Sequence, residues 1–368
     1  MSQPAPLNTR QQQIESARQS YLERGPAAVG AWHLPLLNRS WQRCLERGFL
    51  PRDRVAFAEV SAGARAEALQ GSQQLLVAAR PVIRSLARAM AQTRYFAVLT
   101  NHRGIVVDVH GPVDTQDPRA TALARIGVDL SEAAVGTTAI GLALTDEEAV
   151  WLHQGEHFFD VNTAYSCAGA PVYGPHGELV GMLDLTGIDV LERPALKHLV
   201  VQSVGSVNNA LVLAQPHHLL LRLNWPGLSL GSDADGLVCT DREGYIVAAN
   251  RHAIDMLGLA PGWVALHCSE VFASAWESLY DLARTTTRQS ELPLWSGLRL
   301  QVMALAASDA TAGVGSTGLA GKGSGLPLKD LETSLIRKAV QDAGGNVAEA
   351  ARALGISRAT VYRKLERR

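Results

Sequence analysis

The chain has 368 residues, of which 47% are hydrophobic and 19% charged, and its formal net charge is −1 at pH 7. This composition is ordinary for a globular protein, excludes a uniformly basic one, and at this length predicts two or three domains. No apolar run reaches the roughly 20 residues of a membrane span, and residues 1–19 are polar without a signal-peptide core. We therefore expect a cytoplasmic protein with no membrane partner.

Four widely spaced cysteines, Cys44, Cys167, Cys239 and Cys268, form no paired motif. Such spacing is typical of reduced thiols rather than a disulfide framework or a zinc knuckle. We expect most of them to be small buried hydrophobic residues, and no cofactor is expected.

The first 80 residues predict a helical N-terminal segment, with helical stretches at 11–24 and 64–79 that suggest contacts between protomers. Residues 81–215 have a mixed pattern that predicts an α+β sensor domain. Its expected elements are a helix (81–92), a hairpin (96–99 and 105–109, across the turn 101–104), three strands (150–153, 168–173 and 179–185) and a long helix (193–213).

Residues 222–305 predict a second, smaller α+β domain. Two short strands flank the turn Asp241-Arg-Glu-Gly244, Asn250 opens a helix at 251–257, and a later strand at 298–305 closes the sheet. This pattern resembles the start of a PAS domain, which implies either a sensor or a dimerisation spacer. Residues 306–325 are small and lack an apolar face, which predicts a flexible linker with a span of about 25 Å.

The last predicted unit, residues 326–368, is an all-α helix-turn-helix. Asn346 caps the first helix, whose buried stripe is Ala350, Ala351 and Leu354. Gly355 ends this helix and Ile356 fills the corner. Ser357 then caps the second helix, with Val361 and Leu365 as its buried side.

The exposed side of the second helix gathers positive charge. Residues 326–368 hold nine Lys and Arg against five acidic residues, a net charge of +4, whereas the rest of the chain carries −5. This asymmetry indicates that the terminal unit is the one that binds a polyanion. We predict that Arg358 reads a guanine edge and that later residues contact both bases and phosphates. The candidate DNA-binding residues are Ser357, Arg358, Thr360, Tyr362, Arg363 and Lys364.

Residues 345–365, preceded by a helix around Leu331 and Ile336, resemble the Fis-type DNA-binding domain. In that family the preceding helix contributes to dimerisation and the helix pair reads inverted half-sites. The resemblance therefore implies a homodimer on an inverted repeat of double-stranded DNA.

Four further motifs resemble the GAF domain of AcoR-like activators, the acetoin-catabolism type. They are Val135-Gly-Thr-Thr-Ala-Ile-Gly-Leu-Ala-Leu144, His153-Gln-Gly-Glu-His157, Tyr165-Ser-Cys-Ala-Gly-Ala-Pro171 and Gly181-Met-Leu-Asp-Leu-Thr-Gly187. The segment Arg39-Ser-Trp-Gln-Arg-Cys-Leu-Glu-Arg-Gly-Phe-Leu-Pro51 resembles the helical lead-in of the same regulators. The resemblance implies a sensor for a small-molecule effector.

AcoR-like activators usually carry an ATPase domain between sensor and DNA reader, and this chain departs from that pattern. The nearest match to a phosphate-binding loop, around Gly321 and Lys322, has Ser316 in place of the first glycine and Gly323 in place of the magnesium-binding hydroxyl. We therefore expect a regulator that acts by occupying its operator, by repression or by recruiting RNA polymerase, without ATP hydrolysis.

The motifs place a candidate effector site near one sheet edge, formed by Trp151, His153, His157, Tyr165 and Cys167. A small organic effector in a mostly apolar pocket is the default hypothesis. His153 and His157 also admit a metal site completed by Cys167 or Asp184, although Gly155 favours a loop between them. Cys167 is either an apolar wall or a redox switch with a lowered pKa.

The sequence thus predicts a cytoplasmic, nucleoid-associated, homodimeric transcriptional regulator with no catalytic residues and no assigned metal ligands. Two alternatives stay open. One is a metal- or redox-responsive regulator using His153, His157 and Cys167. The other is a protein-interaction module whose DNA binding is secondary.

Overall fold

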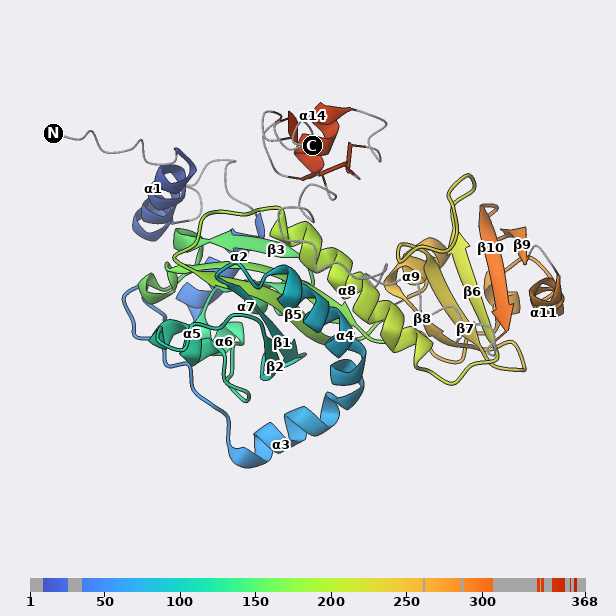
Figure 1. The fold of residues 1–368 in the computed structure, drawn as a ribbon, viewed down its shortest axis with the longest axis horizontal. Coiled ribbons are helices and arrows are strands. Elements are labelled where there is room, and N and C mark those ends of the chain that lie inside the picture. The colour runs from blue at the N-terminus through green and yellow to red at the C-terminus, as the bar shows by residue number, and fades with distance from the viewer. Residues whose placement is uncertain are drawn as a thin grey trace.

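The protein folds into a mixed α+β structure built on two antiparallel sheets of five strands each (Figure 1). The computed structural model describes residues 9–25, 35–260, 262–285 and 288–306, and in the C-terminal segment 336–337, 339–340, 346–354, 358 and 361–362. None of the helices in these ranges is long and apolar enough to cross a membrane. The α+β class predicted from the sequence is confirmed.

The first sheet has the strand order β2-β1-β5-β4-β3, and every neighbouring pair is antiparallel. Its strands are β1 (Tyr95–Asn101), β2 (Val106–His110), β3 (Val150–His153), β4 (Tyr165–Tyr173) and β5 (Leu179–Ile188). The predicted hairpin across residues 101–104 is present, and Gly104 adopts the positive φ of +85° that this turn requires. All five strands predicted between residues 96 and 185 are confirmed.

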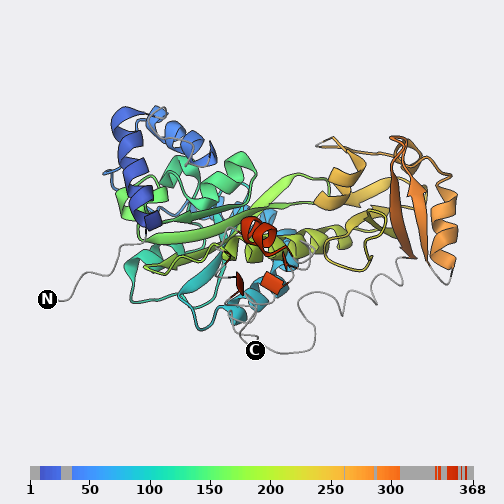
Figure 2. The same ribbon diagram turned by 90° about the horizontal axis from the view of Figure 1, so that it is seen from above.

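Helices cover both faces of the first sheet (Figure 2). One face packs against α4 (Gln73–Ala89) and α8 (Leu196–Leu213). The other packs against α2 (Pro35–Glu46) and the short helices α5 (Pro118–Leu123), α6 (Glu132–Val135) and α7 (Ala139–Asp146). Side chains therefore alternate along β4, with Tyr165 and Cys167 on the second face and Ala168 on the first.

The N-terminal segment is helical, as predicted, but its helices begin and end at other residues than those predicted. It contains α1 (Thr9–Arg24), α2 and α3 (Ala62–Gly71). The predicted break between helices at 64–79 and 81–92 is wrong, since α3 ends at Gly71 and α4 continues through Pro81. Pro81 and Val77 both lie on the exposed side of α4, where solvent can reach the carbonyl that the ring leaves without its helical donor.

The second sheet has the order β8-β7-β6-β10-β9. Its elements are β6 (Leu219–Asn224), β7 (Gly236–Thr240), β8 (Ile246–Ala249), α9 (Arg251–Leu257), α10 (Cys268–Val271), α11 (Glu277–Arg284), β9 (Gln289–Pro293) and β10 (Arg299–Ala306). The predicted β7, β8, α9 and β10 are confirmed, and Asn250 caps α9 by accepting from the amide of Ala253 at 2.9 Å. The central strand β6 was not predicted, because its nearly continuous apolar run has no alternation to reveal a strand.

The helix α8 joins the two sheets through buried amide side chains. Asn209 on α8 accepts a hydrogen bond from Asn250 at 2.7 Å and donates one to the backbone carbonyl of Asp233 at 2.9 Å. Beside them, the amide of Ala249 donates to the carbonyl of Pro175 at 2.8 Å. The two sheets are therefore held by hydrogen bonds as well as by the chain that links them.

In the C-terminal segment the structure describes α14 (Val347–Ala353) and isolated residues around it. The predicted cap is confirmed, since Asn346 Oδ1 accepts from the amides of Ala348 and Glu349 at 3.1 and 3.3 Å. The predicted buried stripe is also confirmed, with Ala350, Ala351, Leu354 and Val361 all buried. Gly355, Ile356, Leu365 and the linker residues 307–325 lie outside the described residues.

Candidate functional site

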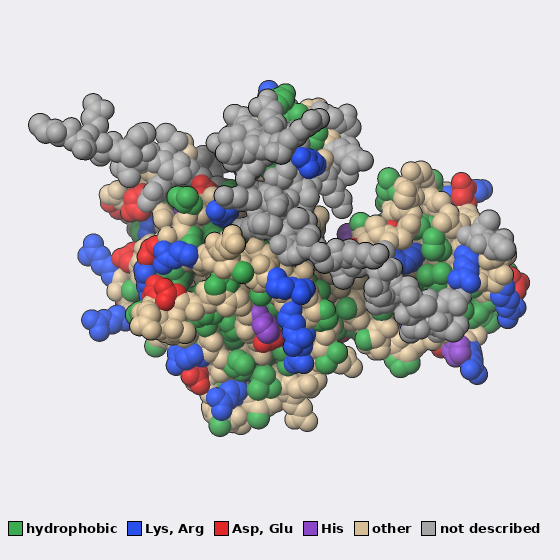
Figure 3. Space-filling model, in the orientation of Figure 1, with side chains coloured by type: hydrophobic (Ala, Val, Ile, Leu, Met, Phe, Trp, Pro, Cys, Tyr) green, Lys and Arg blue, Asp and Glu red, His purple; other side chains and the backbone are tan. Residues whose placement is uncertain are grey.

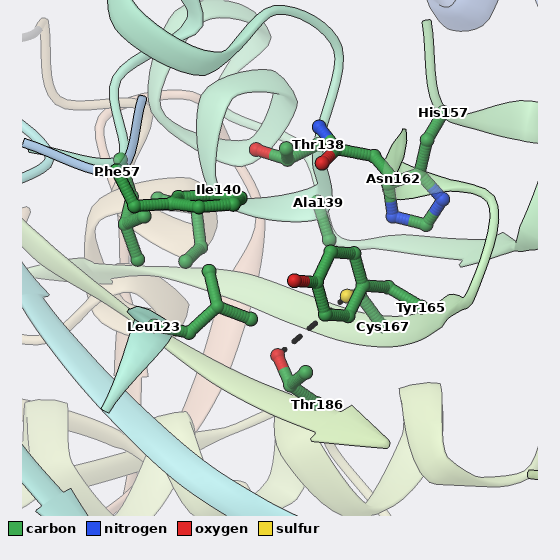
Figure 4. Close-up of a pocket in the computed structure, with 11 residues that line it drawn as sticks. Phe57, Leu123, Thr138, Ala139, Ile140, His157, Asn162, Tyr165, Cys167 and Thr186 are labelled. Carbon is green, nitrogen blue, oxygen red and sulfur yellow. Dashed lines mark hydrogen bonds between the residues drawn. The ribbon is translucent and has the colours of Figure 1, made fainter. Parts of the chain in front are cut away.

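A pocket opens on the face of the first sheet that α5, α6 and α7 cover (Figure 4). Its cavity volume is about 20 Å³, room for about one water molecule, within a wider space of about 310 Å³ that includes open solvent. Its lining consists of apolar and neutral polar side chains: Phe57, Leu123, Leu130, Thr138, Ala139, Ile140, His157, Asn162, Tyr165, Cys167 and Thr186. The composition of this lining suits a small, uncharged molecule, which would enter by moving the surrounding side chains apart.

His157 presents a hydrogen-bond acceptor at this pocket. Its Nδ1 lies 2.9 Å from the carbonyl oxygen of Gln154, which can only accept, so Nδ1 carries the hydrogen and Nε2 holds a lone pair. The ring is fully buried, and burial lowers its pKa to about 4, so it is neutral near pH 7. Nε2 has no hydrogen-bond partner among the described residues.

The other polar groups of the pocket also offer mainly acceptors. Asn162 donates its amide hydrogen to the carbonyl of Val135 at 3.3 Å, whereas its Oδ1 is buried without a partner in the described structure. Tyr165 donates to the carbonyl of Arg119 at 3.3 Å. Thr138 adds a hydroxyl hydrogen, since its oxygen already accepts from the amide of Gly141 at 3.0 Å.

Asp184 lies behind the pocket wall, where the hydroxyl of Thr186 donates to its Oδ2. The carboxyl is completely buried, and burial raises its pKa to about 7, while the bond from Thr186 acts in the opposite direction. Its Oδ1 is unpartnered among the described atoms. The wall thus contains a titratable group poised near neutral pH.

Cys167 is a buried wall of the pocket rather than a reactive thiolate. Burial, and then the nearby carboxyl of Asp184, raises the pKa of its thiol well above the usual value. Its Sγ lies 3.6 Å from Thr186 Oγ1. Of the two alternatives for Cys167, this favours the apolar wall over the redox switch, because the neutral imidazole of His157 supplies no charge to stabilise a thiolate.

Trp151 and His153 do not line this pocket. They lie two residues apart on β3 and share the sheet face that packs against α8, whereas Leu152 between them points to the pocket side. His153 Nδ1 pairs with Ser166 Oγ at 2.6 Å. The structure therefore brings together three of the five predicted residues, His157, Tyr165 and Cys167.

Several lining residues were not predicted, although four of them lie in recognised motifs. Thr138, Ala139 and Ile140 belong to the motif at 135–144 and Thr186 to the motif at 181–187. Thr186 alternates with Leu185 on β5, so strand periodicity could have assigned it to the face of Cys167. Phe57 and Asn162 come from irregular segments whose position depends on tertiary packing.

The metal alternative requires a third ligand near the two histidines. Within the described ranges, no group of three or more His, Cys, Asp or Glu side chains is arranged to hold a metal ion. Between His153 and His157, where a loop was expected from Gly155, the chain forms the 3₁₀ helix η2 (Gln154–Glu156).

Of the candidate DNA-binding residues, the structure describes Arg358 and Tyr362, and both are exposed. Ser357, Thr360, Arg363 and Lys364 lie outside the described residues. On the face shown in Figure 3, the Lys and Arg side chains around the first sheet are interspersed with Asp and Glu. That mixture agrees with the negative net charge of the chain before residue 326.

Comparison with known proteins places two regions of the chain. Residues 10–209 match the family model "MimR, N-terminal domain", and residues 327–367 match "Bacterial regulatory protein, Fis family". The chain belongs to the MimR N-terminal domain family. Its C-terminal segment is a Fis-type helix-turn-helix, as the sequence predicted.

Relatives with assigned roles are transcriptional regulators by name. The chain is 28% identical over 281 residues to the acetoin catabolism regulatory protein of Cupriavidus necator, covering 73% of this chain and 41% of that protein. It is 28% identical over 279 residues to MimR of Mycolicibacterium smegmatis, the propane 2-monooxygenase operon transcriptional activator, covering 72% and 44%. The chain thus spans less than half the length of either relative.

A solved structure resembles the chain more distantly. The crystal structure of the E. coli DhaR(N)–DhaL complex aligns with a TM-score of 0.46 and 14% identity, over 74% of this chain and 99% of that one. In this member of the MimR family, the antiparallel sheet of residues 219–306 lies between the two matched regions.

Proposed function

We propose that this protein is a DNA-binding transcriptional regulator whose first sheet, a GAF-like sensor domain of residues 81–215, binds a small neutral effector. The Fis-type helix-turn-helix supports DNA binding, and the relatives are named as regulators of catabolic operons. The second sheet is a PAS-like domain in this proposal, with the expected boundaries of 222–305 moved to 219–306 because β6 begins at Leu219 and β10 ends at Ala306.

The observation that carries the effector proposal is the pair of unpartnered acceptors, His157 Nε2 and Asn162 Oδ1, in a buried, largely apolar pocket. A buried acceptor without a donor costs free energy, which a ligand hydroxyl would recover. A carboxylate or phosphate would instead face lone pairs without a cationic side chain in the lining. The chemistry therefore favours a neutral molecule of a few carbons that carries at least one hydroxyl group.

We expect acetoin and 1,2-propanediol to raise the thermal midpoint of the protein, and butanone and acetate to leave it unchanged. Butanone has the size but not the hydroxyl, and acetate has the wrong charge. His157→Phe should weaken 1,2-propanediol binding by about fivefold or more, as the loss of one hydrogen bond predicts. Isothermal titration calorimetry measures this change.

The matched control for that variant is Trp151→Phe, which alters an aromatic residue on the opposite sheet face. It should bind 1,2-propanediol like the wild type. Equal affinity of the wild type and His157→Phe, or stabilisation by acetate as strong as by the diol, would contradict the proposed chemistry.

For the DNA-binding end, we expect Arg358→Ala to weaken binding to an operator selected from random sequence by about 1–3 kcal/mol. Binding to random DNA should change little, because a base contact is lost rather than a phosphate contact. Lys364→Ala should instead lower the slope of log binding constant against log salt concentration by about one, because one phosphate contact is lost. Equal losses on operator and random DNA for Arg358→Ala would exclude a base-reading role.

We further propose that the protein acts as a homodimer on an inverted repeat, with half-sites about 34 Å apart, through operator occupancy or contact with RNA polymerase. The antiparallel sheet between sensor and DNA reader supports a mechanism without ATP hydrolysis. Transcription in vitro with the purified protein should proceed without a requirement for ATP beyond that of RNA synthesis.

A further inference from the structure

One buried guanidinium fastens the N-terminal helix α1 to the wall of the pocket. Arg18 is only 5% exposed. Its Nη1 donates to the carbonyls of Gly155, at 3.2 Å, and of His157. Its Nη2 donates to the carbonyl of Phe158 at 2.5 Å and to Asp160 Oδ1 at 2.7 Å. All four acceptors belong to the short segment 155–160.

This segment and the residues that follow it carry both unpartnered acceptors of the pocket. His157 gives its carbonyl to Arg18 while its ring faces the pocket, and Asn162 ends the 3₁₀ helix η3 (Asp160–Asn162). This wall lies between β3 and β4 and is built from two short 3₁₀ helices, and besides Arg18 the amide of Asp160 holds it by donating to the carbonyl of Pro51 at 2.8 Å. The position of the two acceptors therefore depends on what holds residues 155–162.

The side of α1 that contains Arg18 packs against residues 155–160 through other side chains as well. The helix buries Ile14, Arg18 and Tyr21 at the spacing of one helix face, with Leu22 partly buried beside them, and the rest of it is mainly polar. Gly155 allows the close approach, since a Cβ there would lie 3.1 Å from Ile14 Cγ2. The contact surfaces of helix and segment therefore fit each other over more than one residue.

The helix α2 reinforces the same contact. Trp41 donates its indole hydrogen to the carbonyl of Glu156 at 3.1 Å. Its ring lies under the Arg18 guanidinium, 5.9 Å from centroid to Cζ, and meets the ring of Tyr21 edge to face at 5.1 Å. A guanidinium has donors in a rigid planar fork, which suits several carbonyls at once and which a lysine does not reproduce.

We propose that α1 is a latch on the effector pocket and that Arg18 is the positioning residue that sets His157 and Asn162 for the ligand. The role of the pocket in this statement rests on the proposed function. Because the same segment contacts α1 on one side and the pocket on the other, ligand binding and α1 docking strengthen each other. Thermodynamic linkage requires this coupling to be reciprocal.

The test uses hydrogen–deuterium exchange of the full-length chain, which needs no ligand for its first arm. In Arg18→Gln, amides of residues 155–162 should exchange about tenfold faster or more, with the amides of β4 and β5 unchanged. Arg18→Lys should give an intermediate exchange rate, because it keeps the positive charge but loses the planar set of guanidinium donors. Gly155→Val changes the pocket segment instead of α1, and its side chain would crowd Ile14. It should accelerate exchange of the amides of residues 12–24.

The second arm adds 1,2-propanediol as the probe. At saturation it should slow exchange of the α1 amides in the wild type, and Arg18→Gln should bind it at least tenfold more weakly. The matched control is Arg222→Gln. Arg222 is also mostly buried and pairs with a carboxylate and a carbonyl, those of Asp235 and Ser232, but in the second sheet. This control should alter neither the 155–162 exchange nor the affinity.

The outcomes separate the two proposals. If the amides of residues 155–162 exchange at the same rate in Arg18→Gln as in the wild type, the positioning role of Arg18 is overturned, whatever the affinity for 1,2-propanediol. If the wild type fails to bind 1,2-propanediol while Arg18→Gln still loosens the segment, the effector chemistry is contradicted and the positioning role stands. If the wild type binds the probe but α1 exchange does not respond to it, the latch is overturned and the pocket assignment survives.

Discussion

Replacing Asp184 with Asn is expected to stabilise the protein at pH 8 by up to about 4 kcal/mol and to change little near pH 4. The carboxyl is fully buried, and its pKa is raised from 3.8 to about 7. A raised pKa in the folded state favours the protonated form. The wild type is therefore most stable below the unfolded pKa and loses that stability as pH rises through the folded one.

The side-chain amide introduced by Asp184→Asn cannot ionise, so the variant avoids this loss while still accepting the hydrogen bond from Thr186. Urea unfolding of both proteins at several pH values between 4 and 8 measures the difference. Asp189→Asn is the control, since Asp189 has a side chain 54% exposed and an Arg119 partner. A difference between wild type and Asp184→Asn that stays constant over this range would contradict the assignment.

Replacing Glu132 with Ala is expected to destabilise the protein by about 3–5 kcal/mol. This side chain is 3% exposed and ties α2 to α6. It accepts from Arg43 Nε and Nη2 at 2.6 and 2.8 Å and from Arg47 at 3.1 Å. Ser40 adds a fourth bond at 2.6 Å. Removing the carboxylate takes an acceptor from the buried hydroxyl of Ser40 and from Arg43, whose side chain is 24% exposed, and this loss is costlier than the ion pair is favourable.

Chemical denaturation measures this loss, and exchange of the α2 amides shows whether it is local. Glu59→Ala is the matched control, because Glu59 also contacts two arginines, Arg65 and Arg125, but on the surface. Exposed pairs of this kind contribute about 0–1 kcal/mol. Similar losses for Glu132→Ala and Glu59→Ala would show that burial of the network does not matter.

The sequence predicted best where local chemistry determines the structure. The turn at Gly104 and the caps at Asn250 and Asn346 depend on residues a few positions apart, and all three are present as expected. The sequence failed to predict that α4 continues through Pro81, because this depends on whether the proline lies on the exposed side of the packed helix. A proline ends a helix in isolation, but on a solvated side of a packed helix its missing hydrogen bond is tolerated.

For the pocket, the sequence identified motifs that contribute lining residues, but not which side of the sheet each side chain faces. The motif at 153–157 contains His153 and His157, yet β3 sends the first toward α8 and the turn after it sends the second toward the pocket. Neither spacing nor composition distinguishes these directions. Arg18 was not foreseen at all, because a single arginine in a polar helix gives no sign that it will be buried against a segment 137 residues away in sequence.

The helix α8 has a mechanical consequence for the molecule. Its 18 residues form a rod about 27 Å long that packs along the first sheet and ends against the second. A tilt of about 5° at one end of a rod of this length would move its other end by about 2 Å. Because Asn209 near that end is hydrogen-bonded to Asn250 and Asp233, such a tilt would shift the part of the second sheet that these residues contact.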